Sequence, residues 1–248
     1  MKRLVLALAL IAAPITAAPP AAPTAKVGEA KPTRNSYANP SAVIAAELAL
    51  AKDAATRGQW TAFAAAAAPD AVMPYPRLVW AQEWLKGRPN PPKAMTWQTH
   101  EVWSSCDGIL VVSHGAWQDE TQNGYFTTIW QRQPDGRYKW VFTHNDTDVI
   151  DQKVPEMIPA HVAQCPEPAK AAPTPPRRGK PGKPKPVRIK DLPPLDPYSR
   201  TGQSPDGTVQ WSVRVDLDGA HKFSVSWLED GEQRDLLNEL VAAAVPNE

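Results

Sequence analysis

The chain has few cysteines and no hydrophobic run long enough to cross a membrane. Only two of its 248 residues are cysteine. The longest apolar run, Leu4–Ala13, covers about half of the ~20 residues that a membrane-spanning helix needs. No later segment is more apolar, and no HxH or HExxH motif is present. These absences argue against a membrane-spanning protein and against a metal site of the common His-rich kinds.

The first residues form the pattern of a secretory signal. Lys2 and Arg3 precede the apolar run Leu4–Ala13, and the small residues Thr16, Ala17 and Ala18 follow it. This order predicts a signal peptide over residues 1–18. No cysteine follows the cleavage zone, so we expect no lipid-modified N-terminus. The mature protein is expected to be periplasmic or secreted.

Charge is nearly balanced, with 27 Lys and Arg against 26 Asp and Glu. Positive charge gathers among prolines between Lys170 and Lys190. Basic and aromatic residues are not interleaved in a folded element, which argues against nucleic acid as a partner. The basic stretch is either a solvated spacer or a tether that touches anionic envelope polymers or lipid head groups.

Composition divides the chain into segments. Residues 19–38 are rich in Ala and Pro and predict a flexible leader, and residues 39–150 carry the patterns of a folded domain. Asn39 and Pro40 are typical of a helix start, and Gly58 of a helix end. The expected elements before the main sheet are a helix through Arg57, a helix Gln59–Ala68, a strand Ala71–Tyr75 and a helix Val79–Lys86.

Four Trp-rich segments then predict an antiparallel meander, with Asp-Gly turns at Asp107–Gly108 and Asp135–Gly136. The strands are expected at Thr96–Ser105, Ile109–Gln118, Tyr125–Gln133 and Arg137–Asp146. A three-residue loop at Pro134–Gly136 would pair Trp130 with Trp140, Thr128 with Phe142, and Phe126 with His144. We expect these six residues to share the face that packs under the helices.

A second strand pair follows a Pro/Lys/Arg-rich linker at residues 151–200. Within residues 207–229, one face is apolar: Val209, Trp211, Val213, Val215, Phe223, Val225 and Trp227. An isolated hairpin is marginally stable in water. The hairpin therefore either docks on the preceding domain or awaits a partner. Residues 230–248 are expected to form a tail with a short helix.

The order of elements and four sequence segments resemble the nuclear transport factor 2-like superfamily, most of all its SnoaL-like branch and related domains of unknown function. The segments are Gly58–Phe63, Ala68–Val72, Gly124–Arg132 and Asp135–Val141. The resemblance covers about residues 39–149. It implies an α+β fold in which a cone-shaped, curved antiparallel sheet packs on N-terminal helices around a pocket. Members include isomerases, dehydratases and binding modules, so the fold does not decide the function.

Enzymes of this superfamily place a carboxylate or His base in the pocket with a Tyr or acid as hydrogen-bond donor. By this resemblance His144 is the candidate base, with Asp146 on the same strand face and Tyr75 or Tyr125 as donor. The competing interpretation is a His at the rim of the sheet. A ligand pocket would be lined by Phe126, Thr128, Trp130, Trp140, Phe142 and His144.

The hairpin around Asp107–Gly108 brings further titratable groups together. A two-residue turn would pair Glu101 with His114, and a three-residue turn would pair His100 with His114. Two groups are too few for a metal site, so we expect ordinary cross-strand neighbours, no metal and no cofactor.

The two cysteines, Cys106 and Cys165, predict a disulfide, because an exported chain with an even cysteine count is the usual setting for one. This bond would tie the start of the Pro-rich tail to the sheet.

Together these observations favour an exported module that binds an apolar small molecule or a partner. The alternatives are an isomerase- or dehydratase-like enzyme that uses His144, and an envelope-associated structural protein with a cationic tether. A homodimer is compatible with each of them.

Overall fold

The computed structural model describes residues 38–147, 154–166 and 189–243. The predicted signal peptide, the leader up to residue 37 and the centre of the Pro/Lys/Arg-rich linker lie outside the described residues. Within the described part, no helix has the length and hydrophobicity needed to span a membrane.

Three helices accompany the main sheet. Helix α1 (Pro40–Arg57) begins at the predicted proline and is followed by Gly58, whose φ of 98° is a conformation that favours glycine. Helix α2 (Gln59–Ala66) ends earlier than predicted, because Ala67–Pro74 already forms strand β1. Strand β2 (Leu78–Trp80) pairs with β1, which leaves a shorter helix, α3 (Ala81–Leu85), than the sequence predicted.

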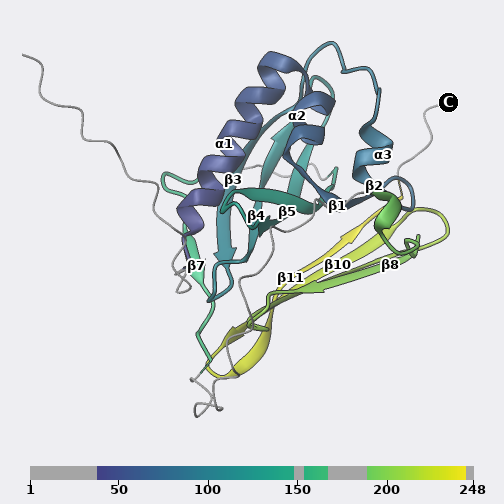
Figure 1. Cartoon of the computed structure of the whole chain (residues 1–248). Helices are drawn as coiled ribbons and strands as arrows, with labels where there is room; N and C mark the ends of the chain where they lie inside the picture. The colour runs from purple at the N-terminus through teal and green to yellow at the C-terminus, as the bar shows by residue number, and fades with distance from the viewer. Residues whose placement is uncertain (1–37, 148–153, 167–188, 244–248) are drawn as a thin grey trace, which may run out of the picture. The chain divides into compact units, whose positions relative to one another are not determined.

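The main sheet has seven strands in the order β2-β1-β6-β5-β4-β3-β7. The predicted meander is confirmed as β3 (Thr96–Ser104), β4 (Leu110–Gln118), β5 (Asn123–Arg132) and β6 (Tyr138–Asn145), all antiparallel. Two parallel pairs extend it: β1 beside β6, and β7 (Ala160–Val162) beside β3. Helices α1 and α2 lie along one face (Figure 1). The predicted α+β class is confirmed.

The register of the β5–β6 hairpin differs from the prediction. Trp130 pairs with Trp140 as expected, but Thr128 pairs with Thr143 and Thr127 with His144. The predicted Thr128–Phe142 and Phe126–His144 pairs are therefore wrong. A register shift between Ile129 and Trp130 places one additional residue in β6.

This bulge moves two side chains to the other face of the sheet, since successive residues of a strand alternate faces. Trp130 and Trp140 remain on the helix face, where their indole N–H groups donate to Glu47 of α1 and to the Phe63 carbonyl of α2. Phe142 and His144 lie on the opposite face, where they contact Phe223.

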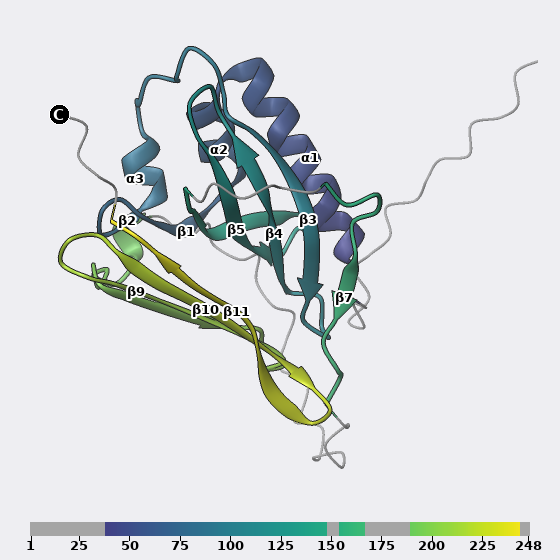
Figure 2. The same cartoon turned by 180° about the vertical axis from the view of Figure 1, so that it is seen from behind.

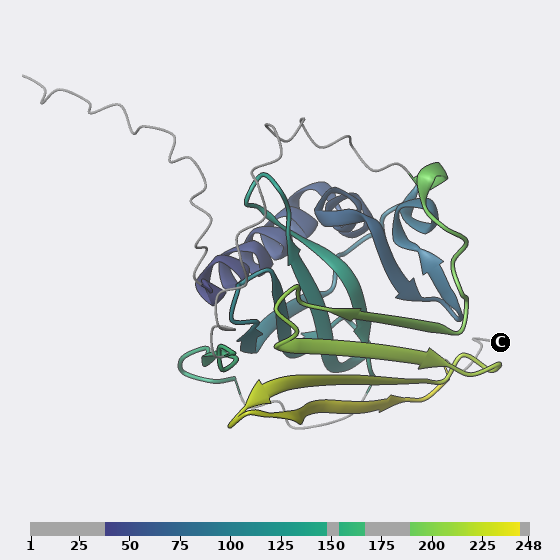
Figure 3. The same ribbon diagram turned by 60° about the horizontal axis from the view of Figure 1, so that its bottom comes forward.

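The C-terminal region is a four-stranded antiparallel sheet in the order β11-β10-β9-β8 (Figure 2), preceded by a short 3₁₀ helix, η1 (Ile189–Asp191). Its strands are β8 (Ser199–Gln203), β9 (Val209–Val215), β10 (His221–Glu229) and β11 (Glu232–Val241). The predicted hairpin is present as β9 and β10 (Figure 3). The helix predicted after residue 230 is wrong over Glu232–Val241, because Asp230 and Gly231 form a turn with positive φ that returns the chain as a strand.

The apolar face of the C-terminal sheet is buried in the same core as the main sheet. Phe142 stacks on Phe223 at 5.0 Å and on Trp211 at 5.3 Å between ring centroids. Val209, Val213 and Phe223 are fully buried. The prediction that the hairpin docks on the preceding domain is therefore confirmed.

Candidate functional site

The helix face of the main sheet is occupied by a buried carboxylate. Glu47 of α1 accepts hydrogen bonds from Ser113 Oγ (2.5 Å), Trp130 Nε1 (2.9 Å) and Trp97 Nε1 (3.0 Å). The three donors belong to three adjacent strands, so this one carboxylate connects α1 to the centre of the sheet. The surroundings of Trp130, where we predicted a ligand pocket, are thus filled by side chains of the protein.

Burial controls the protonation of Glu47. Its side chain is taken out of water, which raises its pKa, and the three hydrogen bonds only partly offset this effect. None of the three donors carries a positive charge. Glu47 therefore holds its proton more readily than an exposed glutamate.

A second polar cluster lies between the two sheets. Glu239 of β11 reaches across to the main sheet, where its carboxylate lies 2.9 Å from His144 Nε2 and 3.3 Å from His114 Nδ1. Thr127 Oγ1 donates to the same carboxylate at 3.0 Å. On its other side, His144 Nδ1 lies 3.3 Å from His221 Nε2 of β10. Each residue of this cluster belongs to a different strand.

The pKa values of Glu239 and His221 in this cluster are both lowered, for different reasons. Burial raises the pKa of Glu239, but contact with the two imidazoles outweighs it and leaves the pKa well below its ordinary value. Burial and the neighbouring His144 lower the pKa of His221 to about 4. Near neutral pH, the cluster therefore contains a carboxylate and a neutral His221.

The structure does not bring the predicted catalytic residues together in a pocket. His144 is 5 % exposed, and its Nε2 contacts Glu239. Tyr75 is 55 % exposed on the turn after β1, where its ring packs on Trp84. The second predicted donor, Tyr125, stacks on His114. His144 has the partners of a proton relay but lies sealed between two sheets.

The pairing around Asp107–Gly108 follows the first of the two predicted alternatives. Glu101 pairs with His114, and His100 lies at a register shift between Thr99 and Glu101. The side chain of Glu101 contacts His161 of β7 at 2.9 Å. Throughout the described ranges, no three His, Cys, Asp or Glu side chains are arranged to hold a metal ion.

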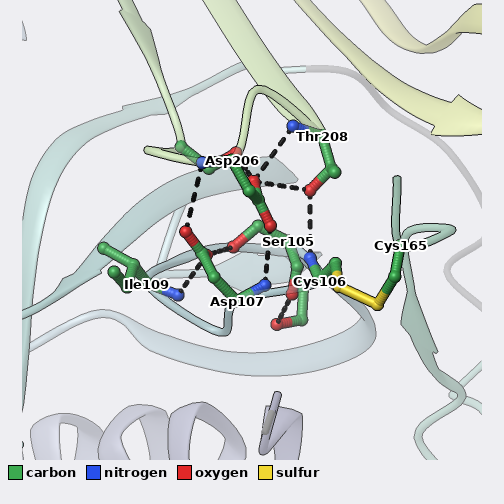
Figure 4. The surroundings of a disulfide bond; sticks show 9 residues. Ser105, Cys106, Asp107, Ile109, Cys165, Asp206 and Thr208 are labelled. Carbon is green, nitrogen blue, oxygen red and sulfur yellow. Dashed lines mark hydrogen bonds between the residues drawn. A yellow bond between two sulfur atoms is a disulfide. The ribbon is translucent and has the colours of Figure 1, made fainter. Parts of the chain in front are cut away.

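The predicted disulfide between Cys106 and Cys165 is present, and it adjoins a junction of two similar turns (Figure 4). The turns are Ser105–Gly108 after β3 and Ser204–Gly207 after β8. In each, the Ser hydroxyl donates to the Asp carboxylate two residues later at 2.6 Å.

The two turns also bind each other reciprocally. The Asp107 N–H donates to Asp206 Oδ2 at 2.7 Å, and the Asp206 N–H donates to Asp107 Oδ2 at 3.3 Å. Thr208 Oγ1 accepts from the Cys106 N–H at 3.0 Å. Burial opposes ionisation of Asp206, but its hydrogen bonds outweigh burial and lower its pKa. The paired turns hold the two sheets together at one end, and the disulfide ties the first of these turns to the segment that follows β7 of the main sheet.

A depression with a volume of ≈ 500 Å³ lies over the outer face of the C-terminal sheet. Six uncharged side chains from three strands line it: Thr201, Gln203, Gln210, Ser212, Ser224 and Ser226. None of these side chains forms a hydrogen bond within the described residues. We call this depression the polar trough. Asp235 stands at its β11 side.

Comparison with known proteins adds little to this geometry. No family model matches the sequence, and no curated protein matches it. One solved structure, of a "putative ketosteroid isomerase" from Parabacteroides distasonis, aligns with 47 % of this chain and 98 % of its own, at 16 % identity and a TM-score of 0.37. A likeness of this size establishes neither a family nor an activity.

Sequence reasoning missed Glu47, Glu239 and the polar trough. Glu47 lies in the apolar period of α1, and a glutamate among apolar helix positions was the available signal. Glu239 lay in the segment predicted as a tail. The trough residues alternate with Val209, Trp211 and Val213, so they read as an ordinary solvent face.

Proposed function

We propose that the protein is a non-catalytic binding module, and that its ligand is a hydroxyl-rich polymer segment such as an oligosaccharide, bound in the polar trough. The observation that carries this proposal is the lining: six hydroxyl and amide side chains that have no hydrogen-bond partner among the described residues face one depression. Such groups both donate and accept hydrogen bonds, as sugar hydroxyls do. The expected export of the chain would place it among extracellular polymers.

The placement of the titratable groups also supports binding over catalysis. A catalytic base needs access to substrate in an open pocket. His144 and Glu47 are both buried, and neither lines the polar trough or the smaller depression that shares residues of β8 with it. A ligand in the trough would instead meet side chains suited to hydrogen bonding.

Calorimetric titration of the full chain with neutral oligosaccharides tests this function. Gln210→Ala and Thr201→Val each remove polar atoms from the trough, and we expect binding to weaken several-fold, as for one lost hydrogen bond of about 1 kcal/mol. Gln98→Ala is the matched control, since Gln98 is also an exposed glutamine on a strand. Equal effects of Gln210→Ala and Gln98→Ala would contradict the proposal.

The enzyme alternative has one observation in its favour, the Glu239–His144–His221 chain of contacts. For this chain to act as a base, the C-terminal sheet would have to separate from the main sheet. Isomerase activity that is abolished by His144→Gln, with folding intact, would establish this alternative and overturn a purely binding role.

A further inference from the structure

Arginine side chains stacked on aromatic rings gather near one edge of the C-terminal sheet. Arg77 lies over Tyr198 at 5.1 Å, Arg200 over Trp80 at 5.4 Å, and Arg88 over Trp84 at 3.4 Å. We call these three residues the arginine row. Their elements are neighbours, because the Leu78 N–H of β2 donates to the Pro197 carbonyl just before β8.

Arg88 is the most constrained of the three. It lies on Trp84 and 5.6 Å from the centroid of Tyr75, whose ring also packs on Trp84 at 4.5 Å. Its Nε donates to the Trp84 carbonyl at 3.4 Å. Neither terminal nitrogen has a partner among the described residues, and a guanidinium held in this way can bind a carboxylate through two parallel hydrogen bonds.

No member of the arginine row forms an ion pair with a carboxylate of the described residues. Acidic side chains are nearby but do not engage it: Asp196 accepts from the Tyr198 N–H, and Asp70 borders the same depression as Arg200. By contrast, Arg57, Arg137 and Arg234 are each paired with an aspartate or glutamate. The row therefore presents three positive charges that no described carboxylate neutralises, each stacked on an aromatic ring.

The row adjoins the polar trough. A second depression, of ≈ 120 Å³, is lined by Arg200 together with Thr201, Gly202 and Gln203. The last three also line the trough, so β8 borders both. A polymer in the trough would thus bring its next units over the edge strand to Arg200.

We propose that the ligand is an acidic polysaccharide, with carboxylate groups bound by Arg77, Arg88 and Arg200 and a sugar ring packed on Tyr75. This inference rests on the proposed function, since it specifies the class of polymer that enters the trough. Sugar rings have apolar C–H faces that pack on aromatic rings. The positive charges of the arginine row favour a ligand that carries acidic groups. An anionic membrane fits less well, because among the described residues the large exposed apolar side chains near the row are Tyr75 and Leu217, whose turn adjoins Pro76, and these two offer little area for insertion.

The test measures binding of the full chain to alginate, to neutral dextran and to phosphatidylglycerol vesicles by calorimetry and co-sedimentation. One variant carries Arg77→Gln, Arg88→Gln and Arg200→Gln. Its matched control carries Arg57→Gln, Arg137→Gln and Arg234→Gln, which removes the same charge from ion-paired positions. We expect alginate affinity to fall at least ~10-fold in the first and less than ~3-fold in the control, as charge-assisted bidentate contacts are the strong ones. Three Lys replacements should restore only part of the loss.

Each other outcome decides against the proposal in a distinct way. Equal losses in both triple variants would show non-specific charge attraction. Binding to vesicles but not to alginate would assign the row to a membrane. Dextran binding that depends on Gln210, without preference for alginate, would refute the acidic ligand and leave the proposed function standing, whereas no binding to either polymer would refute both. If the triple variant melts at a lower temperature than its control, the Arg77→Gln and Arg137→Gln single variants provide the same comparison.

Discussion

Each face of the main sheet meets a glutamate from another element, buried on the helix face and partly buried on the other, and the two pKa values shift in opposite directions. On the helix face, Glu47 accepts hydrogen bonds from a serine and two tryptophans, and its pKa is raised. On the face toward the C-terminal sheet, Glu239 contacts two histidines and a threonine, and its pKa is lowered. Both are screened from water by neighbouring elements. Their pKa values shift in opposite directions because the side chains that contact them differ.

Neutral donors reduce the cost of burying a carboxylate, but they provide no opposite charge. Histidine side chains can provide this opposite charge when they take up a proton. The helix face is therefore organised to tolerate an isolated acid, whereas the contact between the sheets gains from keeping Glu239 ionised. The stability contributed by Glu47 is therefore kept at low pH, whereas the stability contributed by Glu239 is lost as the pH falls.

Removal of Trp130 should have the largest effect on the helix face. Trp130→Ala deletes a side chain that is 1 % exposed and one of the three donors to Glu47. We expect a loss of roughly 3–5 kcal/mol in the free energy of unfolding, as for large aromatic truncations in cores. Urea denaturation measures it. Trp130→Phe keeps most of the ring and should cost much less; a loss under about 1 kcal/mol for the Ala variant would contradict the placement.

The disulfide is the covalent connection beside the paired turns, and it ties the turn after β3 to the segment after β7. It closes a loop with a sequence separation of 59. The double variant Cys106→Ser and Cys165→Ser should lose roughly 4 kcal/mol by the chain-entropy account of such a loop. Thermal unfolding with and without reductant provides the measurement. If reduction leaves the unfolding temperature unchanged, the backbone pairing of β7 with β3 holds this segment without the bond.

Acid should weaken the contact between the sheets through His221. In the unfolded chain His221 binds a proton as the pH falls through 6.5, but in the folded chain only near 4. Stability is therefore lost as the pH falls from 6.5 to 4, by up to about 3 kcal/mol at ~1.4 kcal/mol per pKa unit. Glu239, whose folded pKa is lowered, adds a loss below its ordinary value of 4.5.

Urea unfolding at several pH values between 4 and 7 checks this slope. His221→Asn should flatten it, because the group that titrates is gone. His161→Asn, at a half-exposed position with its own glutamate partner, should leave the slope in place. A slope that survives His221→Asn would mean that another group of the cluster causes it.

The sequence predicted one face of the sheet better than the other. Turn residues and alternation located all four meander strands, since those signals are local. The register of β6 beyond Trp140 depended on a bulge, and no residue of the hairpin marks it. Phe142 and His144 were assigned to the wrong face for this reason.

The candidate sites were harder to predict, because they depend on contacts distant in the chain. Glu239 meets His144 across two sheets, and α1 brings Glu47 to strands more than fifty residues later. The disulfide was predictable because export and an even cysteine count restrict the choice to one pair. The sequence Ser-x-Asp-Gly occurs at both Ser105–Gly108 and Ser204–Gly207, but nothing local in either copy indicates that the two turns pair.

The smallest expected effect is the sharpest test of the comparison. Glu47→Gln keeps the size of the side chain but replaces one acceptor oxygen by an NH₂ group, which conflicts with one of its three donors. We expect a loss of about 1–2 kcal/mol near pH 7 from the unmatched hydrogen bond.

Because the folded pKa of Glu47 is raised, its contribution in the wild type is largest at low pH and declines as the pH rises above 4.5. Glu239→Gln should show the reverse, since the wild-type contribution of Glu239 is present above 4.5 and is lost as the pH falls. Urea unfolding of both variants across pH 4–7 would therefore give stability differences that change in opposite directions with pH. If the two differences change in the same direction, the partners of the two carboxylates do not control their ionisation.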